Sequence, residues 1–165
     1  MSSLNLSNRQ AADLYWLAFL LTGQRDTSVD ATAEALDTAE AKPFFSAWML
    51  AWARKVVIAK ALGAIRAELA ASALRIAAAR GRNVASTPRD WSLASGATKA
   101  ELERALLAID AFPRCVLLLS LFEGLSIDDA TVLLDVDRDL IRKAQAFALQ
   151  ELTQNLAAIQ ERSHV

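Results

Sequence analysis

The sequence of 165 residues has one cysteine, one histidine, three prolines and five glycines. A single thiol, Cys115, excludes an internal disulfide, and its place in the apolar run 115–119 predicts a core position. A single imidazole, His164, leaves too few groups for a zinc site or for a serine or cysteine catalytic triad. We therefore expect no metal, no cofactor and no catalytic residues.

Long apolar runs are also lacking. None approaches the roughly 18 residues that a transmembrane helix requires, and the first residues lack the basic and apolar segments of a secretion signal. These absences predict a cytoplasmic protein that does not contact a membrane.

Paired carboxylates are the remaining sign of an enzyme. Asp128 with Asp129 and Glu101 with Glu103 both fall where helices are predicted to begin, and acidic residues stabilise helix N-termini. A glycine-rich phosphate loop is absent as well. The sequence therefore predicts that the protein is not an enzyme.

The formal net charge is only −1, so the chain lacks the strong positive charge of a simple nucleic-acid-binding domain. The charges are unevenly distributed, however. Acidic residues dominate 25–40, basic residues dominate 54–82, and acidic residues outnumber basic ones after residue 98. An acidic helix beside a basic one suits a protein contact on one side and phosphates on the other, although such charges also simply keep a helical bundle soluble.

Alanine is abundant and helix breakers are few, which predicts an all-α fold. Ser7 with Gln10, Thr98 with Glu101, and Ser126 with Asp129 predict helix N-termini. We predict helices over residues 7–22, 28–40, 44–80, 98–111, 114–123, 126–134 and 138–160.

Turn-forming residues gather between positions 81 and 97, where we place a linker between two small helical domains, 1–80 and 98–165. In the second domain, residues 135–137 separate a short helix from a longer one. This spacing predicts a helix-turn-helix.

Two of the four tryptophans lie in the long helix of the first domain. The pattern there predicts one apolar face, consisting of Trp48, Trp52, Val56, Ala59 and Leu62. Tryptophans at helical spacing most often pack in a core, but on a surface such rings can stack on unpaired bases. The basic residues of this helix are the stronger candidates for DNA contacts.

Residues 106–126 carry a more specific pattern: leucines, then Pro113 and Arg114, an aliphatic run, and the segment Glu123-Gly124-Leu125-Ser126. This stretch resembles the helix-turn-helix domain of bacterial RNA polymerase sigma factors of the extracytoplasmic-function type. The spacing continues without a gap through Asp129, Leu134, Val136, Ile141, Ala148 and Leu152. More loosely, residues 14–23 and 44–55 resemble the first helix and the promoter-melting helix of the same family.

The resemblance implies a transcription initiation protein whose partners are core RNA polymerase, promoter DNA and, as a further candidate, an anti-sigma factor. Polymerase contacts would fall on Asp26, Asp30, Glu34 and Asp37. Contacts to melted DNA would fall on Trp48, Trp52, Arg54, Lys55 and Lys60. Contacts to the upstream promoter element would fall on Arg138, Arg142, Lys143 and Gln145.

The chain departs from the family pattern at residues 27–32, where an acidic pair and a glutamine are expected. In the helix-turn-helix domain, Thr131, Asp135 and Phe147 stand where an alanine, a glycine and an arginine are expected. Carboxylates at 135, 137 and 139 also repel phosphates, so we expect the C-terminal domain alone to bind DNA weakly. An alternative is therefore a degenerate sigma-like module that binds a regulator or polymerase without reading DNA. A plain alanine-rich bundle explains the composition but not the helix-turn-helix spacing.

Overall fold

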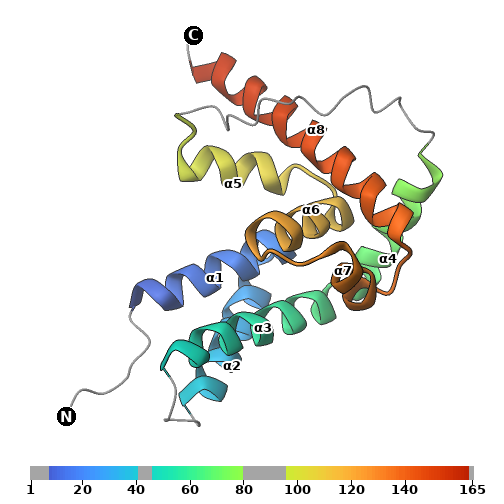
Figure 1. Ribbon diagram of the computed structural model, residues 1–165. Helices are drawn as coiled ribbons and strands as arrows, with labels where there is room; N and C mark the ends of the chain where they lie inside the picture. Colours follow the sequence, from blue (N-terminus) through green and yellow to red (C-terminus); the bar gives the residue numbers. More distant parts are fainter. Residues whose placement is uncertain (1–7, 41–45, 80–95, 164–165) are drawn as a thin grey trace. The chain divides into compact units, whose positions relative to one another are not determined.

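The computed structural model describes residues 8–40, 46–79 and 96–163, which form helices and turns and contain no strand, so the all-α prediction is confirmed (Figure 1). The elements are α1 (Asn8–Thr22), α2 (Arg25–Glu40), α3 (Ser46–Ala64), α4 (Arg66–Ala78), α5 (Lys99–Leu107), α6 (Ala111–Leu117), the π-helical turn η1 (Leu118–Phe122), α7 (Ile127–Leu134) and α8 (Arg138–Ser163).

The chain divides into two compact units, Met1–Arg66 and Ala67–Val165. The division lies within the stretch 44–80 that we assigned to the first domain, because this stretch breaks at Ile65 and α4 packs inside the second unit. Most of the predicted linker, residues 81–95, and Ser7 of the first predicted cap lie outside the described residues.

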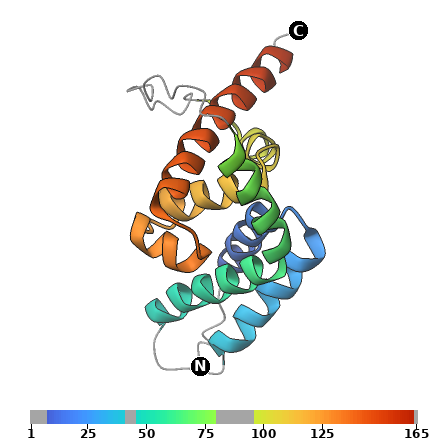
Figure 2. The ribbon, with the colours of Figure 1, turned by 90° about the vertical axis from the view of Figure 1, so that its right-hand side faces the viewer.

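The first unit is built on three helices that pack against one another (Figure 2). Alanines permit the close approach, since three on α2 at four-residue spacing and two on α3 that are eight residues apart are almost fully buried. They are Ala31, Ala35 and Ala39, and Ala53 and Ala61. The predicted end of the first helix at Thr22 and Gly23 is confirmed: Gly23 takes a φ of 69°, a conformation that suits glycine.

The buried face of α3 differs from the predicted one. Of the five residues predicted to be apolar contacts, only Leu62 is buried, whereas Trp48 is 77% and Trp52 is 44% exposed. The residues that α3 buries are Met49, Ala53, Val57, Ile58, Ala61 and Leu62, and Ile65 is buried directly after it. The prediction was wrong because it began the face at the two tryptophans, whereas the core beside the alanines of α2 is filled by alanines and aliphatic side chains on another side of the helix.

In the second unit, α6 is the central element, and every residue from Ala111 to Leu119 is buried. Helix α8 packs over both α5 and α6, as Figure 1 shows. Cys115 is fully buried, which confirms the predicted core position, and burial raises the pKa of its thiol to about 12. The thiolate that reactive cysteines require is therefore strongly disfavoured here.

Local signals placed several helix ends correctly. Thr98 and Glu101 form a reciprocal capping box, and Ser126 accepts a hydrogen bond from the backbone N–H of Asp129 at 3.1 Å. The predicted break at Phe112 and Pro113 was wrong, because α6 begins at Ala111 and contains both residues. Proline is tolerated there because a backbone N–H in the first turn has no partner within the helix.

No helix in the described part of the chain has both the length and the apolar character that crossing a membrane requires.

Candidate nucleic-acid interfaces

An exposed aromatic and basic face runs along α3 in the first unit. Trp48, Trp52 and Lys55 stand at positions i, i+4 and i+7, so all three lie on one side of the helix, and all three are exposed. Indole rings offer surfaces on which unpaired bases stack, and an ammonium beside them attracts the phosphate backbone. We call these three residues the α3 face.

The other two cations predicted on this helix lie away from the α3 face. Arg54 is half-buried. Lys60 is exposed and forms an ion pair with Glu34 of α2, its Nζ lying 2.6 Å from Oε1. The structure thus brings together three of the five predicted melting residues.

The predicted polymerase-binding residues all lie exposed on α2. Asp26, Asp30, Glu34 and Asp37 follow the spacing i, i+4, i+8 and i+11, which places them along one stripe of the helix. Glu34 contributes to this stripe and to the ion pair with Lys60. The stripe offers a continuous negative surface to a basic partner.

In the second unit, three residues join α7 to α8. Asp135 adopts the left-handed conformation, with φ 53° and ψ 50°, and its backbone N–H closes α7 by donating to the carbonyl of Thr131. Asp137 accepts a hydrogen bond from the backbone N–H of Leu140 at 2.8 Å, so its carboxylate caps α8. The turn therefore gives its two aspartates different structural roles.

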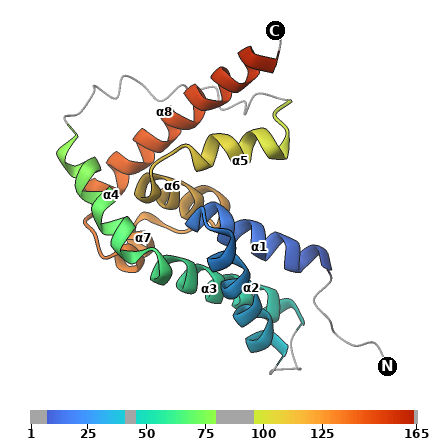
Figure 3. The ribbon, with the colours of Figure 1, turned by 180° about the vertical axis from the view of Figure 1, so that it is seen from behind.

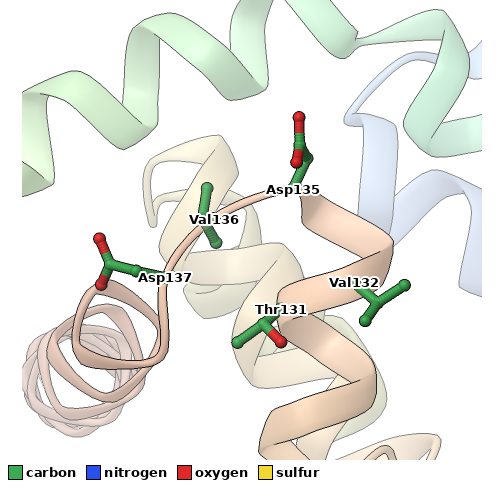
Figure 4. A pocket seen from close by; sticks show the side chains of 5 residues that line it. All are labelled: Thr131, Val132, Asp135, Val136 and Asp137. Carbon is green, nitrogen blue, oxygen red and sulfur yellow. The ribbon is translucent and has the colours of Figure 1, made fainter.

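A shallow surface depression of about 490 Å³ lies at this turn. Figure 4 shows Thr131 and Val132 projecting from α7, and Asp135, Val136 and Asp137 from the turn. Two carboxylates in such a small area repel an approaching phosphate. The depression itself is thus unsuited to an anionic ligand.

The first turns of α8 carry the residues predicted to contact the upstream promoter element. Arg138 pairs with Asp128 at 3.4 Å, and both side chains are exposed. Arg142 stands one turn further along and is exposed, and no ion pair or hydrogen bond within the described residues engages its side chain. Gln145 lies on the same side of the helix and is half-buried.

Lys143 points away from these residues. Its Nζ donates hydrogen bonds to the backbone carbonyls of Ala77, at 3.2 Å, and Ala79, at 2.5 Å, at the C-terminal end of α4. Figure 3 shows this end of α4 beside the first part of α8. The structure therefore separates Lys143 from Arg138, Arg142 and Gln145, with which it was grouped.

The contacts that hold α4 were not predicted from the sequence. Ser72 is fully buried and accepts a hydrogen bond from the backbone N–H of Phe112 at 2.9 Å. Arg75 binds the carboxylate of Asp110 through two hydrogen bonds of 2.8 Å each. These partners are 35 to 40 residues apart in the chain, and no spacing rule links them.

Among the described residues, no three His, Cys, Asp or Glu side chains are grouped so that they could hold a metal ion. A comparison of the sequence with protein-family models finds no matching family, and a comparison with curated proteins finds no matching relative.

Proposed function

We propose that this chain is a sigma factor-like transcription initiation protein that binds core RNA polymerase in the cytoplasm and directs it to promoter DNA. The observation that supports the proposal most is the α3 face. Two tryptophans that are 77% and 44% exposed lose the hydrophobic stabilisation of burial, and stacking on bases would restore it.

The acidic stripe of α2 has a separate role in this proposal. Asp26, Asp30, Glu34 and Asp37 would bind a basic surface of the polymerase, while the α3 face remains available for DNA. The ion pair between Lys60 and Glu34 connects the two helices that carry these surfaces.

In the second unit, α7, the turn and α8 would act as a helix-turn-helix, with Arg142 and Gln145 presented to the major groove. Few cations are available there, because Arg138 pairs with Asp128 and Lys143 binds α4. DNA binding by this unit alone would then be weak. Attachment to polymerase would supply the missing affinity by raising the local concentration of the unit near DNA.

The same shortage of cations favours a second candidate, a sigma-like interaction module that binds polymerase or a regulator, such as an anti-sigma factor, without reading DNA. The acidic residues Asp135, Asp137 and Asp139 add to this case. The two candidates differ in whether promoter-dependent transcripts are made.

Polymerase capture followed by transcription tests both candidates. The protein is incubated with bacterial core RNA polymerase, recovered, and supplied with a pool of random duplex DNA, and the 5′ ends of the transcripts are sequenced. Our proposal predicts binding and transcripts that start downstream of a shared sequence. Binding without such transcripts would favour the interaction module, and absence of binding would reject both.

A pair of matched variants tests the polymerase contact. Asp30→Ala/Asp37→Ala removes two charges from the acidic stripe and should weaken capture of the polymerase. Asp13→Ala/Glu68→Ala removes two exposed carboxylates elsewhere and should leave capture unchanged. If the two double variants changed polymerase capture equally, the acidic stripe would not be part of the polymerase interface.

A further inference from the structure

Helix α4 contacts the rest of the second unit through polar groups at three points. Ser72 binds the backbone at the start of α6, Arg75 binds Asp110, and the carbonyls of Ala77 and Ala79 bind Lys143 of α8. Besides these polar contacts, α4 buries only three apolar side chains, those of Leu69, Ala73 and Ile76. An attachment made of so few contacts can open without unfolding the rest of the unit.

The contact with Lys143 follows from the chemistry of helix ends. The last carbonyls of an α-helix have no partners within the helix, and the helix dipole makes this end partly negative. An ammonium group at this position satisfies two carbonyls and is stabilised by the dipole. Lys143 is therefore held in place by α4.

The contact between Lys143 and α4 involves a residue next to the predicted DNA contacts of α8. Lys143 directly follows Arg142, the exposed cation near the start of α8. Two of the three N–H donors of this ammonium are used by the carbonyls at the end of α4, which also fix Lys143 on the side of α8 that faces α4. Phosphate and the end of α4 are thus competitors for one ammonium group.

We infer that α4 is an autoinhibitory clasp, which withholds Lys143 from DNA until α4 detaches. The inference rests on the proposed function, in that it assumes that α8 approaches DNA. Detachment of α4 would add one cation to the DNA contact, and binding to DNA would in turn favour detachment.

A matched pair of double variants tests the clasp. Arg75→Ala/Ile76→Ala removes the bond to Asp110 and a buried side chain that holds α4. Arg66→Ala/Leu74→Ala makes nearly the same chemical changes at exposed positions of the same helix, where Leu74 is 71% exposed. Circular dichroism establishes that both proteins are folded.

The first measurement uses no DNA. Lysines are acetylated by an N-hydroxysuccinimide ester, and mass spectrometry gives the rate at Lys143 relative to exposed Lys55. We expect the relative rate to rise several-fold in the Arg75 variant and to stay unchanged in the Arg66 variant. Equal relative rates in the two variants would overturn the clasp.

The second measurement is the binding of a short labelled duplex as salt is varied. Relative to its control, the clasp variant should gain about one phosphate contact, which steepens the dependence of log K on log[salt] by about 0.9 and tightens binding about fivefold to tenfold at 0.1 M salt. Adding Lys143→Ala should abolish this gain. If Lys143 becomes accessible while DNA binding matches the control, control of DNA binding by α4 is overturned.

A third measurement remains informative if the double variant does not fold. Lys143→Gln should speed amide hydrogen exchange in the last turn of α4, and the control Arg142→Gln should leave it unchanged. Equal exchange in the two would contradict the clasp. If none of the proteins binds the duplex while exchange and acetylation respond as expected, the attachment of Lys143 to α4 stands and the inferred control of DNA binding is overturned. The transcription experiment with polymerase decides the proposed function separately.

Discussion

Arg75 and Asp110 meet in a two-point pair, in which Nε and Nη2 of the guanidinium each lie 2.8 Å from a different carboxylate oxygen. The same carboxylate accepts a hydrogen bond from the backbone N–H of Ala111, so Asp110 caps α6 and anchors α4 at once. A single side chain therefore connects the central helix of the second unit to the helix that we infer to be a clasp.

This pair predicts a pH dependence. The hydrogen bonds from Arg75, followed in size by those from Ser72 and the backbone of Ala111, lower the pKa of Asp110, while desolvation opposes them. Because the pKa is lower in the folded than in the unfolded state, the pair stabilises the protein at pH values above the ordinary carboxyl pKa of about 4. That stability is lost as the pH falls through the lowered pKa.

Asp110→Asn should therefore reduce the free energy of unfolding near neutral pH and flatten its decline in acid, since asparagine keeps the cap but not the charge. Urea unfolding at a series of pH values measures both effects. Parallel pH profiles for wild type and variant would show that the pair makes no such contribution.

Substitutions of the two aspartates in the α7–α8 turn should change the free energy of unfolding in opposite directions. Asp135 holds a left-handed conformation that glycine adopts at lower cost, so Asp135→Gly should stabilise the protein by about 0.5–1 kcal/mol. Asp137 caps α8, so Asp137→Ala should destabilise it by about 1 kcal/mol. Urea unfolding distinguishes the two, and a stability loss in Asp135→Gly would contradict the first expectation.

The α3 face should bind single-stranded DNA by stacking. Removing one stacking ring costs about 1–3 kcal/mol, so Trp48→Ala and Trp52→Ala should each weaken binding of a labelled oligonucleotide at least fivefold. Val29→Ala, which removes an exposed apolar side chain on α2, is the control. Fluorescence anisotropy measures the affinities, and equal affinities for all four proteins would exclude stacking on these rings.

The cations of α8 should contribute unequally to duplex binding. Arg142→Ala removes an exposed charge and should reduce the slope of log K against log[salt] by about 0.9. Lys143→Ala should reduce it less, because α4 holds this ammonium part of the time. Arg104→Ala, which removes an exposed cation on α5, serves as the control. An unchanged slope in Arg142→Ala would remove this residue from the DNA contact.

Sequence reasoning succeeded where the determining interaction is local. The caps at Thr98 and Ser126 depend on residues three positions away, and the burial of Cys115 follows from the apolar run around it. The face of α3 was misplaced because alanine suits both core and surface, so neither hydropathy nor spacing identified the residues that pack against α2.

The arrangement around α4 was beyond prediction for a different reason. Lys143 and Ala77 are 66 residues apart, and their contact exists only once α4 has packed in the second unit. The sequence grouped Lys143 with Arg142 as a DNA contact near the start of the last helix and gave no sign of its contact with α4. Its partner is a backbone carbonyl, and carbonyls carry no sequence signal.

The most direct test of the central claim compares duplex and premelted templates. On a promoter identified by the transcription experiment, core polymerase with the Trp48→Ala/Trp52→Ala protein is measured against wild type on duplex DNA and on the same DNA with an unpaired bubble. Our account predicts that the variant loses most of its transcripts on duplex DNA and recovers wild-type yield on the bubble. An unchanged yield on duplex DNA, or an equal loss on both templates, would contradict a role of the α3 face in opening the promoter.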